Sequence, residues 1–206
     1  IAAAVEAVNA PAVADVVDQV VAIESPALPE LTDGARTQEQ LLWMTKGIAK
    51  DAQAAGVSRI MVDLEIMGKK ERQASRDTHI SNHRKEDIAK IRAVLDAGEL
   101  IVRINPWYDG SRHEVDHAVA NGADWIMLPM IDDMAQFHAF IGVLAGRARP
   151  LPLLETTYAM EHTADIAGHA AVTELYIGLN DLHLSLGLSY LFDPLAAGIV
   201  DRMAKD

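Results

Sequence analysis

The sequence predicts an α/β protein of the (β/α)8, or TIM, barrel class, with only part of the barrel visible in this chain. Three observations carry the prediction. Short apolar runs alternate with helical patterns, several helical patterns end at Ala-Gly or Asn-Gly, and most of the apolar runs are followed by polar residues. Polar groups at the carboxyl ends of many parallel strands favour a barrel. A doubly wound sheet usually opens with a Gly-rich fingerprint, and this sequence contains none.

Six apolar runs are expected to be strands, and five stretches between them are expected to be helices. The strands are expected at 41–44, 59–64, 100–104, 125–128, 151–154 and 174–177. The helices are expected near 46–55, 83–97, 111–121, 133–145 and 158–167. Ser111 and Glu114 fit a capping box at the start of the third helix. Six strand–helix units are therefore visible where a closed barrel needs eight, so we expect the chain to be a fragment or to close by other means.

Residues 1–40 are expected to form an N-terminal helical extension and linker, separate from a barrel domain at 41–206. Asn9 and Pro11 are typical of a helix start, and Pro26 and Pro29 would end that helix. Between them, valines recur at helical spacing, at Val13, Val16, Val17, Val20 and Val21. The segment contains no polar cluster that suggests chemistry, so a packing or oligomerisation helix is expected.

Composition narrows the classes of function. With 206 residues, of which 50% are hydrophobic and 23% charged, the chain is expected to fold as one domain or at most two. A net charge of −12 disfavours nucleic acid as a partner, because such a surface repels phosphate. The absence of cysteine excludes disulfides, thiolate metal sites and a cysteine nucleophile. No apolar run is long enough to span a bilayer and no basic leader is present, so a cytoplasmic protein with no membrane partner is expected.

Two carboxylates form the strongest candidate site. Glu155 and Asp181 each follow an apolar run, 26 residues apart, on strands expected to be neighbours. Such a pair suits a hard divalent cation, since Mg²⁺ commonly takes one or two carboxylates and completes its shell with water and substrate oxygens. The alternative is that each acid caps the helix that follows it.

Other polar residues follow neighbouring strands. Asp63 and Glu65 alternate and should point the same way, one as a general base and the other as its orienter, unless Glu65 lies beyond the strand in solvent. Arg103 is expected to bind a substrate carboxylate or a developing enolate, or to pair with one of these acids.

The loop after the sixth strand is the other part of the expected substrate site. Gly178 leaves room for backbone amides to approach a carboxylate, just before Asn180 and Asp181. His183 lies two residues beyond Asp181 and is more simply explained as a loop or helix-start histidine.

One motif points to different chemistry. The segment His113–His117 matches H-E-x-x-H, in which two histidines bind zinc and Glu114 activates water. Ala120 stands where the extended motif has glycine, and the apolar residues Val115 and Ala118 mark the buried side of an outer barrel helix. The zinc peptidase is therefore a remote alternative.

Most of these candidate site residues lie in five segments whose order and spacing resemble those of a known family. The segments 62–65 (VDLE), 102–105 (VRIN), 122–129 (GADWIMLP), 153–156 (LLET) and 177–187 (IGLNDLHLSLG) resemble the HpcH/HpaI aldolase and citrate lyase β-chain family, which has a phosphoenolpyruvate/pyruvate-type barrel. The likeness runs from about residue 41 to 206, and five motifs in order at barrel spacing make it specific.

The resemblance implies a carbon–carbon lyase that acts on a 2-keto acid or an acyl-CoA thioester through an enolate. It implies Mg²⁺ or Mn²⁺ bound by Glu155 and Asp181, a substrate oxygen held by Arg103, and a carboxylate held by the backbone of residues 178–181. It also implies a homo-oligomer, a trimer or a hexamer.

The sequence departs from the family at the general base. The family's aldolases carry a histidine directly after the acid at 65, and its citrate lyase chains carry an acid there, whereas this chain has Ile66. Asp63, Glu65 and His183 remain candidates for the base. The departure also keeps open a protein of the same fold without lyase activity, either a thioester hydrolase or a binding scaffold.

Overall fold

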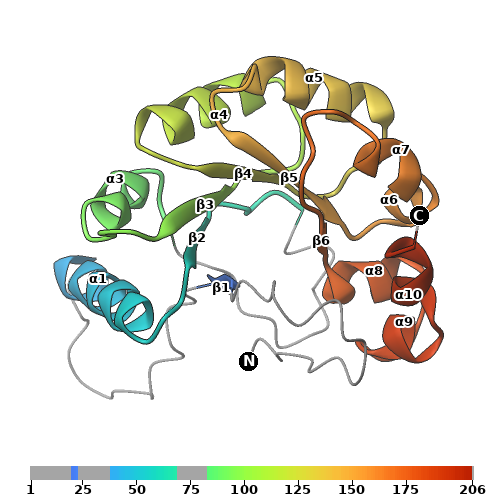
Figure 1. Ribbon diagram of the computed structural model, residues 1–206, viewed down its shortest axis with the longest axis horizontal. Helices are drawn as coiled ribbons and strands as arrows, with labels where there is room; N and C mark the ends of the chain where they lie inside the picture. Colours follow the sequence, from blue (N-terminus) through green and yellow to red (C-terminus); the bar gives the residue numbers. More distant parts are fainter. Residues whose placement is uncertain (1–19, 23–37, 69–82, 206) are drawn as a thin grey trace.

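Six parallel strands form one curved sheet. The computed structural model describes residues 20–22, 38–68 and 83–205 (Figure 1). The strands lie side by side in the order in which they occur along the chain. They are β1 (Val20–Ala22), β2 (Arg59–Asp63), β3 (Glu99–Arg103), β4 (Trp125–Leu128), β5 (Arg149–Leu154) and β6 (Tyr176–Ile177). The fold is an incomplete α/β barrel, and this confirms the fold class that the sequence predicts.

The helices cover the outer, convex face of the sheet and the end of β6. In Figure 1, α3 to α7 form an arch over the sheet, and α8 to α10 lie together beside β6. Their bounds are α1 (Gln38–Ala54), α3 (Asp87–Arg92), α4 (Ser111–Ala120), α5 (Met134–Leu144), α6 (Thr157–Glu161), α7 (Thr163–Ala167), α8 (Leu179–Ser185), α9 (Asp193–Ala196) and α10 (Ile199–Met203). Within the part of the chain that the structure describes, none of these helices is both long and apolar enough to cross a membrane.

The two faces of the sheet belong to two separate apolar cores. Ile60, Val62 and Leu100 face the helices and belong to the larger core. The opposite face, inside the arch, is covered by Ile101, Trp125, Met127, Leu151 and Leu153, each at most 2% exposed. Because both faces are buried, the strands read as continuous apolar runs in the sequence, which is typical of a parallel sheet.

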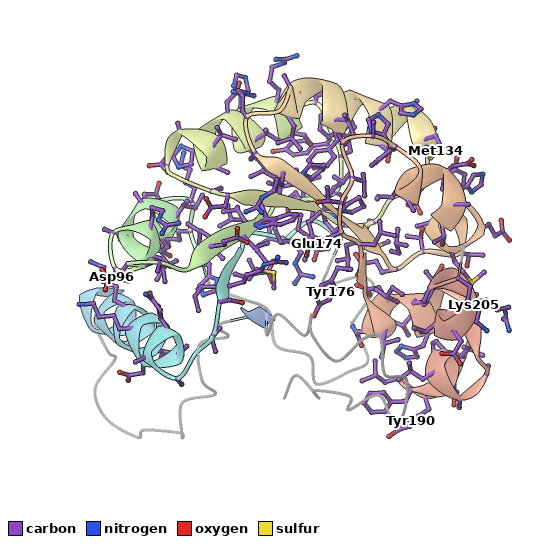
Figure 2. The ribbon with its side chains drawn as sticks, viewed as in Figure 1. Asp96, Met134, Glu174, Tyr176, Tyr190 and Lys205 are labelled. Atoms are coloured by element: carbon purple, nitrogen blue, oxygen red, sulfur yellow. The ribbon has the colours of Figure 1, made fainter. Side chains whose placement is uncertain are left out.

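A polar network lies on the face of the sheet away from the helices, at the amino ends of the strands, and we call it the floor network. The Arg59 guanidinium donates hydrogen bonds to Glu174 and, over 3.0 Å, to Glu99. Figure 2 shows Glu174 beneath the sheet, close to Tyr176 at the start of β6. Arg59 and Arg149 both lie over the Trp125 ring, 4.7 and 3.9 Å from its centroid. Since β2 and the segment before β6 are joined directly, this network holds the sheet in its curved form.

Two expected elements near the N-terminus are wrong. Val20–Ala22 forms a strand paired with β2, although its valines fit a helical repeat. Valine is β-branched and favours strands, and a short apolar run cannot be assigned from periodicity alone. For the same reason residues 41–44, expected as a strand, lie within α1. The rest of the expected N-terminal helix lies outside the described residues, and the division of the chain into 1–40 and 41–206 stays a prediction.

The expected helix ends are confirmed after α1 and α4 and wrong after α3, which ends at Arg92 where a helix to about residue 97 was expected. Gly56 and Gly122 adopt left-handed backbone angles, with φ of 92° and 90°, directly after α1 and α4. Asp133 caps α5 by accepting a 2.8 Å hydrogen bond from the Ala135 amide. The capping box at α4 is wrong, because Ser111 Oγ accepts its hydrogen bond from the Tyr108 amide at 2.9 Å. The Glu114 carboxylate points to other partners, described below.

Removing the central cation of the floor network should destabilise the fold. Arg59 is 7% exposed, and in Arg59→Met the carboxylates of Glu99 and Glu174 lose its guanidinium. We expect the free energy of unfolding, measured by urea denaturation, to fall by about 1–3 kcal/mol, since Arg59 is buried while the carboxylates of Glu99 and Glu174 are 33% and 39% exposed. Arg147→Met is the matched control, because Arg147 pairs with Asp116 at the surface and should contribute at most about 1 kcal/mol. Equal losses in the two variants would contradict this role of the network.

Candidate functional site

An ion pair between neighbouring strands lies at the centre of the candidate site. The parallel register places Asp63, the last residue of β2, opposite Arg103, the last residue of β3. Arg103 donates two hydrogen bonds to Asp63, from Nε to Oδ1 at 2.8 Å and from a terminal nitrogen to Oδ2 at 2.7 Å. This two-point contact fixes the plane of the guanidinium. Burial alone would lower the pKa of Arg103, but the hydrogen bonds and charge of Asp63 raise it above its ordinary value.

Glu65 belongs to the same site. Its side chain is fully buried, and its carboxylate lies 3.5 Å from the remaining terminal nitrogen of Arg103. Its backbone amide donates to Asp63 Oδ1 at 3.0 Å. Asp63 and Glu65 therefore do face the same site, and the alternative of a solvated Glu65 is wrong. Of the two interpretations of Arg103, the structure shows the pair with Asp63, and a role toward substrate stays a prediction.

Glu155 reaches the site from the end of β5. It is 3% exposed, and one carboxylate oxygen accepts a 3.1 Å hydrogen bond from the Met130 amide. Met130 has φ of 52°, a left-handed conformation that is rare for a side chain of its size and is often found at functional sites. One residue further along both turns, the Thr156 hydroxyl donates to the Ile131 carbonyl at 2.6 Å. The turn after β4 thus supplies backbone groups that hold the turn after β5.

Gly178 makes room for Glu155. A Cβ atom at Gly178 would lie 2.7 Å from Glu155 Oε2 and 2.9 Å from Glu155 Cβ. The space beside this glycine therefore holds the Glu155 side chain, where the sequence had suggested room for a ligand carboxylate. Gly178 also precedes α8, whose first turn carries the half-buried Asn180 and the buried Asp181.

The site carries an excess of buried negative charge. We define the acidic cluster as Asp63, Glu65, Glu155 and Asp181, each at most 8% exposed, together with Arg103. With every group ionised, four carboxylates and one guanidinium give a formal charge of −3. Burial, followed by the charges of Glu65 and Asp181, raises the pKa of Glu155 to about 8, against the opposing effects of Arg103 and the Met130 amide.

The donors of this cluster fit a hard divalent cation. Buried carboxylates that repel one another are stabilised by a cation, and oxygen-only donors suit Mg²⁺ or Mn²⁺. Among the described residues, no three His, Asp or Glu side chains are arranged to bind a metal by themselves. A site built on Glu155 and Asp181 would therefore need oxygens from water or substrate, as magnesium sites commonly do.

The H-E-x-x-H segment is part of the scaffold. Glu114 accepts hydrogen bonds from Asn105 and Tyr108. His117 Nε2 lies 3.2 Å from the Lys85 carbonyl, and His113 is exposed. With the glutamate engaged in this way, the segment does not form the arrangement that activates water beside zinc.

Two residues near the site were given no role by the sequence analysis. Asn105 Oδ1 accepts hydrogen bonds from the Ile66 and Met67 amides, and its position after Arg103 at a strand end was the signal for it. His83 is half-buried, and its Nδ1 accepts a 3.1 Å hydrogen bond from the Asp63 amide. Nothing in the sequence around His83 connects it to Asp63, twenty residues earlier.

Comparison with known proteins supports the fold. No protein-family model and no curated protein sequence matches the chain. Solved structures do match. They include macrophomate synthase (13% identity, TM-score 0.58), the citrate synthase SbnG (16%, 0.59) and an HpcH/HpaI aldolase/citrate lyase family protein from Burkholderia cenocepacia J2315 (17%, 0.58). The resemblance drawn from the sequence is thus confirmed at the level of the fold.

The match is partial in length. These alignments cover 77–78% of this chain and 63%, 68% and 70% of the three neighbours. The chain therefore spans about two thirds of the length of the proteins that it is similar to.

Filling the space beside Gly178 should disturb the site. Gly178→Ala would force Glu155 or the backbone of β6 to move, and we expect a loss of about 1–3 kcal/mol in unfolding free energy. Gly142→Ala is the matched control, because nothing lies within 4 Å of its Cβ position and alanine favours the helix α5. Urea denaturation of both variants measures the difference. A Gly178→Ala protein as stable as Gly142→Ala would show that Glu155 does not occupy this space.

The raised pKa of Glu155 predicts a specific pH dependence of stability. Between its ordinary value of 4.5 and about 8, the folded chain holds a proton that the unfolded chain has lost. Stability from this group is therefore complete below about pH 4.5 and is lost as the pH rises through 8. In EDTA, we expect the unfolding free energy of the wild type to fall from pH 5 to pH 8 relative to Glu155→Gln, which cannot titrate. Glu161→Gln, on the surface of α6, should follow the wild type, and parallel curves for all three proteins would contradict the assignment.

Proposed function

We propose that this protein is a divalent-metal-dependent carbon–carbon lyase that acts on a small carboxylate with a 2-keto or thioester group. The single observation that carries the proposal is the acidic cluster, which gathers buried carboxylates from the ends of β2 and β5 and from α8, and in which Asp63 orients one guanidinium. The fold shared with aldolase and citrate lyase family structures supports it. Preorganised charge beside a developing enolate is often the largest single contribution to catalysis of this kind.

In this proposal Glu155 and Asp181 hold Mg²⁺ or Mn²⁺. The bound cation would act as a Lewis acid that polarises the substrate carbonyl and favours the enolate. Glu155 is oriented for its role by the Met130 amide, and Gly178 keeps the space that its side chain fills. Asn180 and the backbone of residues 179–181, in the first turn of α8, would hold the substrate carboxylate, since the Gly178 amide donates to the Leu154 carbonyl.

Arg103 would hold the oxygen on which negative charge develops. Asp63 occupies Nε and one terminal nitrogen, so the guanidinium cannot rotate. The other terminal nitrogen faces Glu65 at 3.5 Å, longer than a normal hydrogen bond, and is the one we assign to the substrate. A buried guanidinium is effectively always charged, so it stabilises the enolate without exchanging a proton.

These contacts reduce the number of candidates for the general base. Both oxygens of Asp63 accept hydrogen bonds from Arg103, so we assign Asp63 to orienting Arg103 and not to proton transfer. Glu65 and His183 remain. His183 is buried, and its Nδ1 lies 3.1 Å from the Leu179 carbonyl, so in the neutral ring Nδ1 carries the proton and Nε2 is the basic nitrogen.

A second candidate function keeps the fold but lacks lyase chemistry. Ile66 is 61% exposed at the end of β2, at the position where the resembled aldolases carry a histidine. An aliphatic side chain there can neither accept nor donate a proton, which favours a thioester hydrolase or a binding scaffold over an aldolase. In either case we propose a small carboxylate or acyl-CoA as the ligand and a trimer or hexamer as the assembly.

Proton exchange on pyruvate tests the proposal most simply. In D₂O with Mg²⁺ or Mn²⁺, we expect the protein to exchange the pyruvate methyl protons, followed by NMR, and EDTA to stop the exchange. Glu155→Gln and Asp181→Asn should abolish the metal-dependent rate and leave the fold intact, and Arg103→Lys should lower it at least about 100-fold. Glu161→Gln is the control for each variant.

The alternatives give different results in the same assay. Hydrolysis of an acyl-CoA without carbon–carbon cleavage or proton exchange would favour the hydrolase. Metal-dependent exchange that is unchanged in both Glu155→Gln and Asp181→Asn would refute the assignment of these ligands.

A further inference from the structure

The segment that carries Glu65 is held by every one of its backbone amides. After β2, the Leu64 amide donates to the Arg103 carbonyl at 2.9 Å and the Glu65 amide to Asp63 Oδ1 at 3.0 Å. The amides of Ile66 and Met67 both donate to Asn105 Oδ1, at 2.9 and 3.0 Å. We call residues 64–67 the β2 loop. Its position, and with it the position of the Glu65 carboxylate, depends on the residues that end β3.

Asn105 is in turn oriented by Glu114 on α4. The Asn105 backbone amide donates to Glu114 Oε2 at 3.0 Å, and its side-chain Nδ2 donates to Oε1 at 2.8 Å. A carboxylate only accepts hydrogen bonds, so it fixes the Nδ2 side of the Asn105 amide toward α4. The Oδ1 side must then face the β2 loop, where two backbone amides need an acceptor.

The turn before α4 is shaped to complete this arrangement. The Tyr108 hydroxyl donates to Glu114 Oε1 at 2.8 Å, and the Tyr108 amide donates to Ser111 Oγ. A Cβ atom at Gly110 would lie 2.4 Å from the Tyr108 ring, so glycine is what lets the ring lie across this turn. The two oxygens of Glu114 thus accept hydrogen bonds from three donors. The H-E-x-x-H motif in α4 is explained by this role of its glutamate in the scaffold.

We propose that Glu114 is a positioning residue that acts through Asn105 to hold the β2 loop, and so sets Glu65 against Arg103. The chain of contacts runs from α4 to the end of β3, then to the end of β2, and ends at the acidic cluster. Its effect on the reaction rate rests on the proposed function. Its effect on the loop does not, because the hydrogen bonds of Ile66 and Met67 can be measured without substrate.

Glu114→Gln tests this chain with little change in size. One carboxylate oxygen becomes an amino group, which would face a donor of Asn105 or Tyr108. In the place of Oε1 this group faces Asn105 Nδ2, so the Asn105 side-chain amide must turn, and Ile66 and Met67 then lose their acceptor. In the place of Oε2 it faces the Asn105 backbone amide and pushes Asn105 away from α4. We expect hydrogen exchange of the Ile66 and Met67 amides, measured by NMR on the whole chain, to speed up at least about 10-fold, since exchange reports local opening. The Val102 amide, inside β3, should be unchanged.

The kinetic result should separate positioning from a structural effect. Because Arg103 keeps both bonds to Asp63, we expect KM to stay within about threefold while kcat falls about 10- to 100-fold, as misplaced groups typically cause. Tyr108→Phe keeps both bonds between Glu114 and Asn105 and should retain nearly the wild-type rate. Asp116→Asn is the matched control, because it changes a carboxylate of the same helix that pairs with the exposed Arg147 and not with Asn105.

A second variant keeps the proposal falsifiable if Glu114→Gln does not fold. Asn105→Ala removes the acceptor directly and should release the same two amides. Combining it with Glu114→Gln should add little, since residues in one chain of contacts are not additive. Unchanged exchange at Ile66 and Met67, equal release in Asp116→Asn, or released amides with an unchanged kcat would each overturn the proposal. If the wild type itself shows no proton exchange on pyruvate, the proposed function fails, and the amide measurements still decide whether Glu114 holds the loop.

Discussion

The bidentate ion pair between Arg103 and Asp63 is the interaction on which the candidate site depends. A guanidinium at the buried end of a parallel strand must be matched by a carboxylate, and the register of β2 and β3 places Asp63 directly opposite. The fixed plane of Arg103 determines which of its nitrogens the other carboxylates can reach. Glu65 lies against its remaining nitrogen, and Glu155 is close enough to feel its charge.

The amino and carboxyl ends of the strands differ in their balance of charge. At the amino ends of the strands, Arg59 and Arg149 meet Glu99 and Glu174, two positive groups against two negative ones. At the carboxyl ends, four buried carboxylates gather around a single guanidinium charge, and two of them, Asp63 and Glu65, contact it. The balanced end stabilises the curved sheet. The unbalanced end stores a surplus of negative charge that a cation can neutralise, and this is the end where barrels of this class place their chemistry.

Much of the fold follows from the alternation of short apolar runs and helical patterns, because each parallel strand is buried on both faces. The same rule identified Asp63, Arg103 and Glu155 as strand-end residues without any knowledge of their contacts. Sequence reasoning failed where the answer depends on partners far along the chain. The valines of β1 fit a helix until β2 is placed beside them, and Glu114 fits a capping box until Asn105 is placed beside it. The contact between His83 and Asp63 has no local signal at all.

Diffraction from crystals grown with Mn²⁺ would test whether the acidic cluster binds a divalent cation, because the anomalous signal of the ion locates it without reference to activity. We expect a peak within coordination distance of the carboxylates of Glu155 and Asp181, on the side of the acidic cluster that faces Arg103. A peak elsewhere, for example at His113 and His117, or no peak at a saturating concentration of the ion, would contradict it.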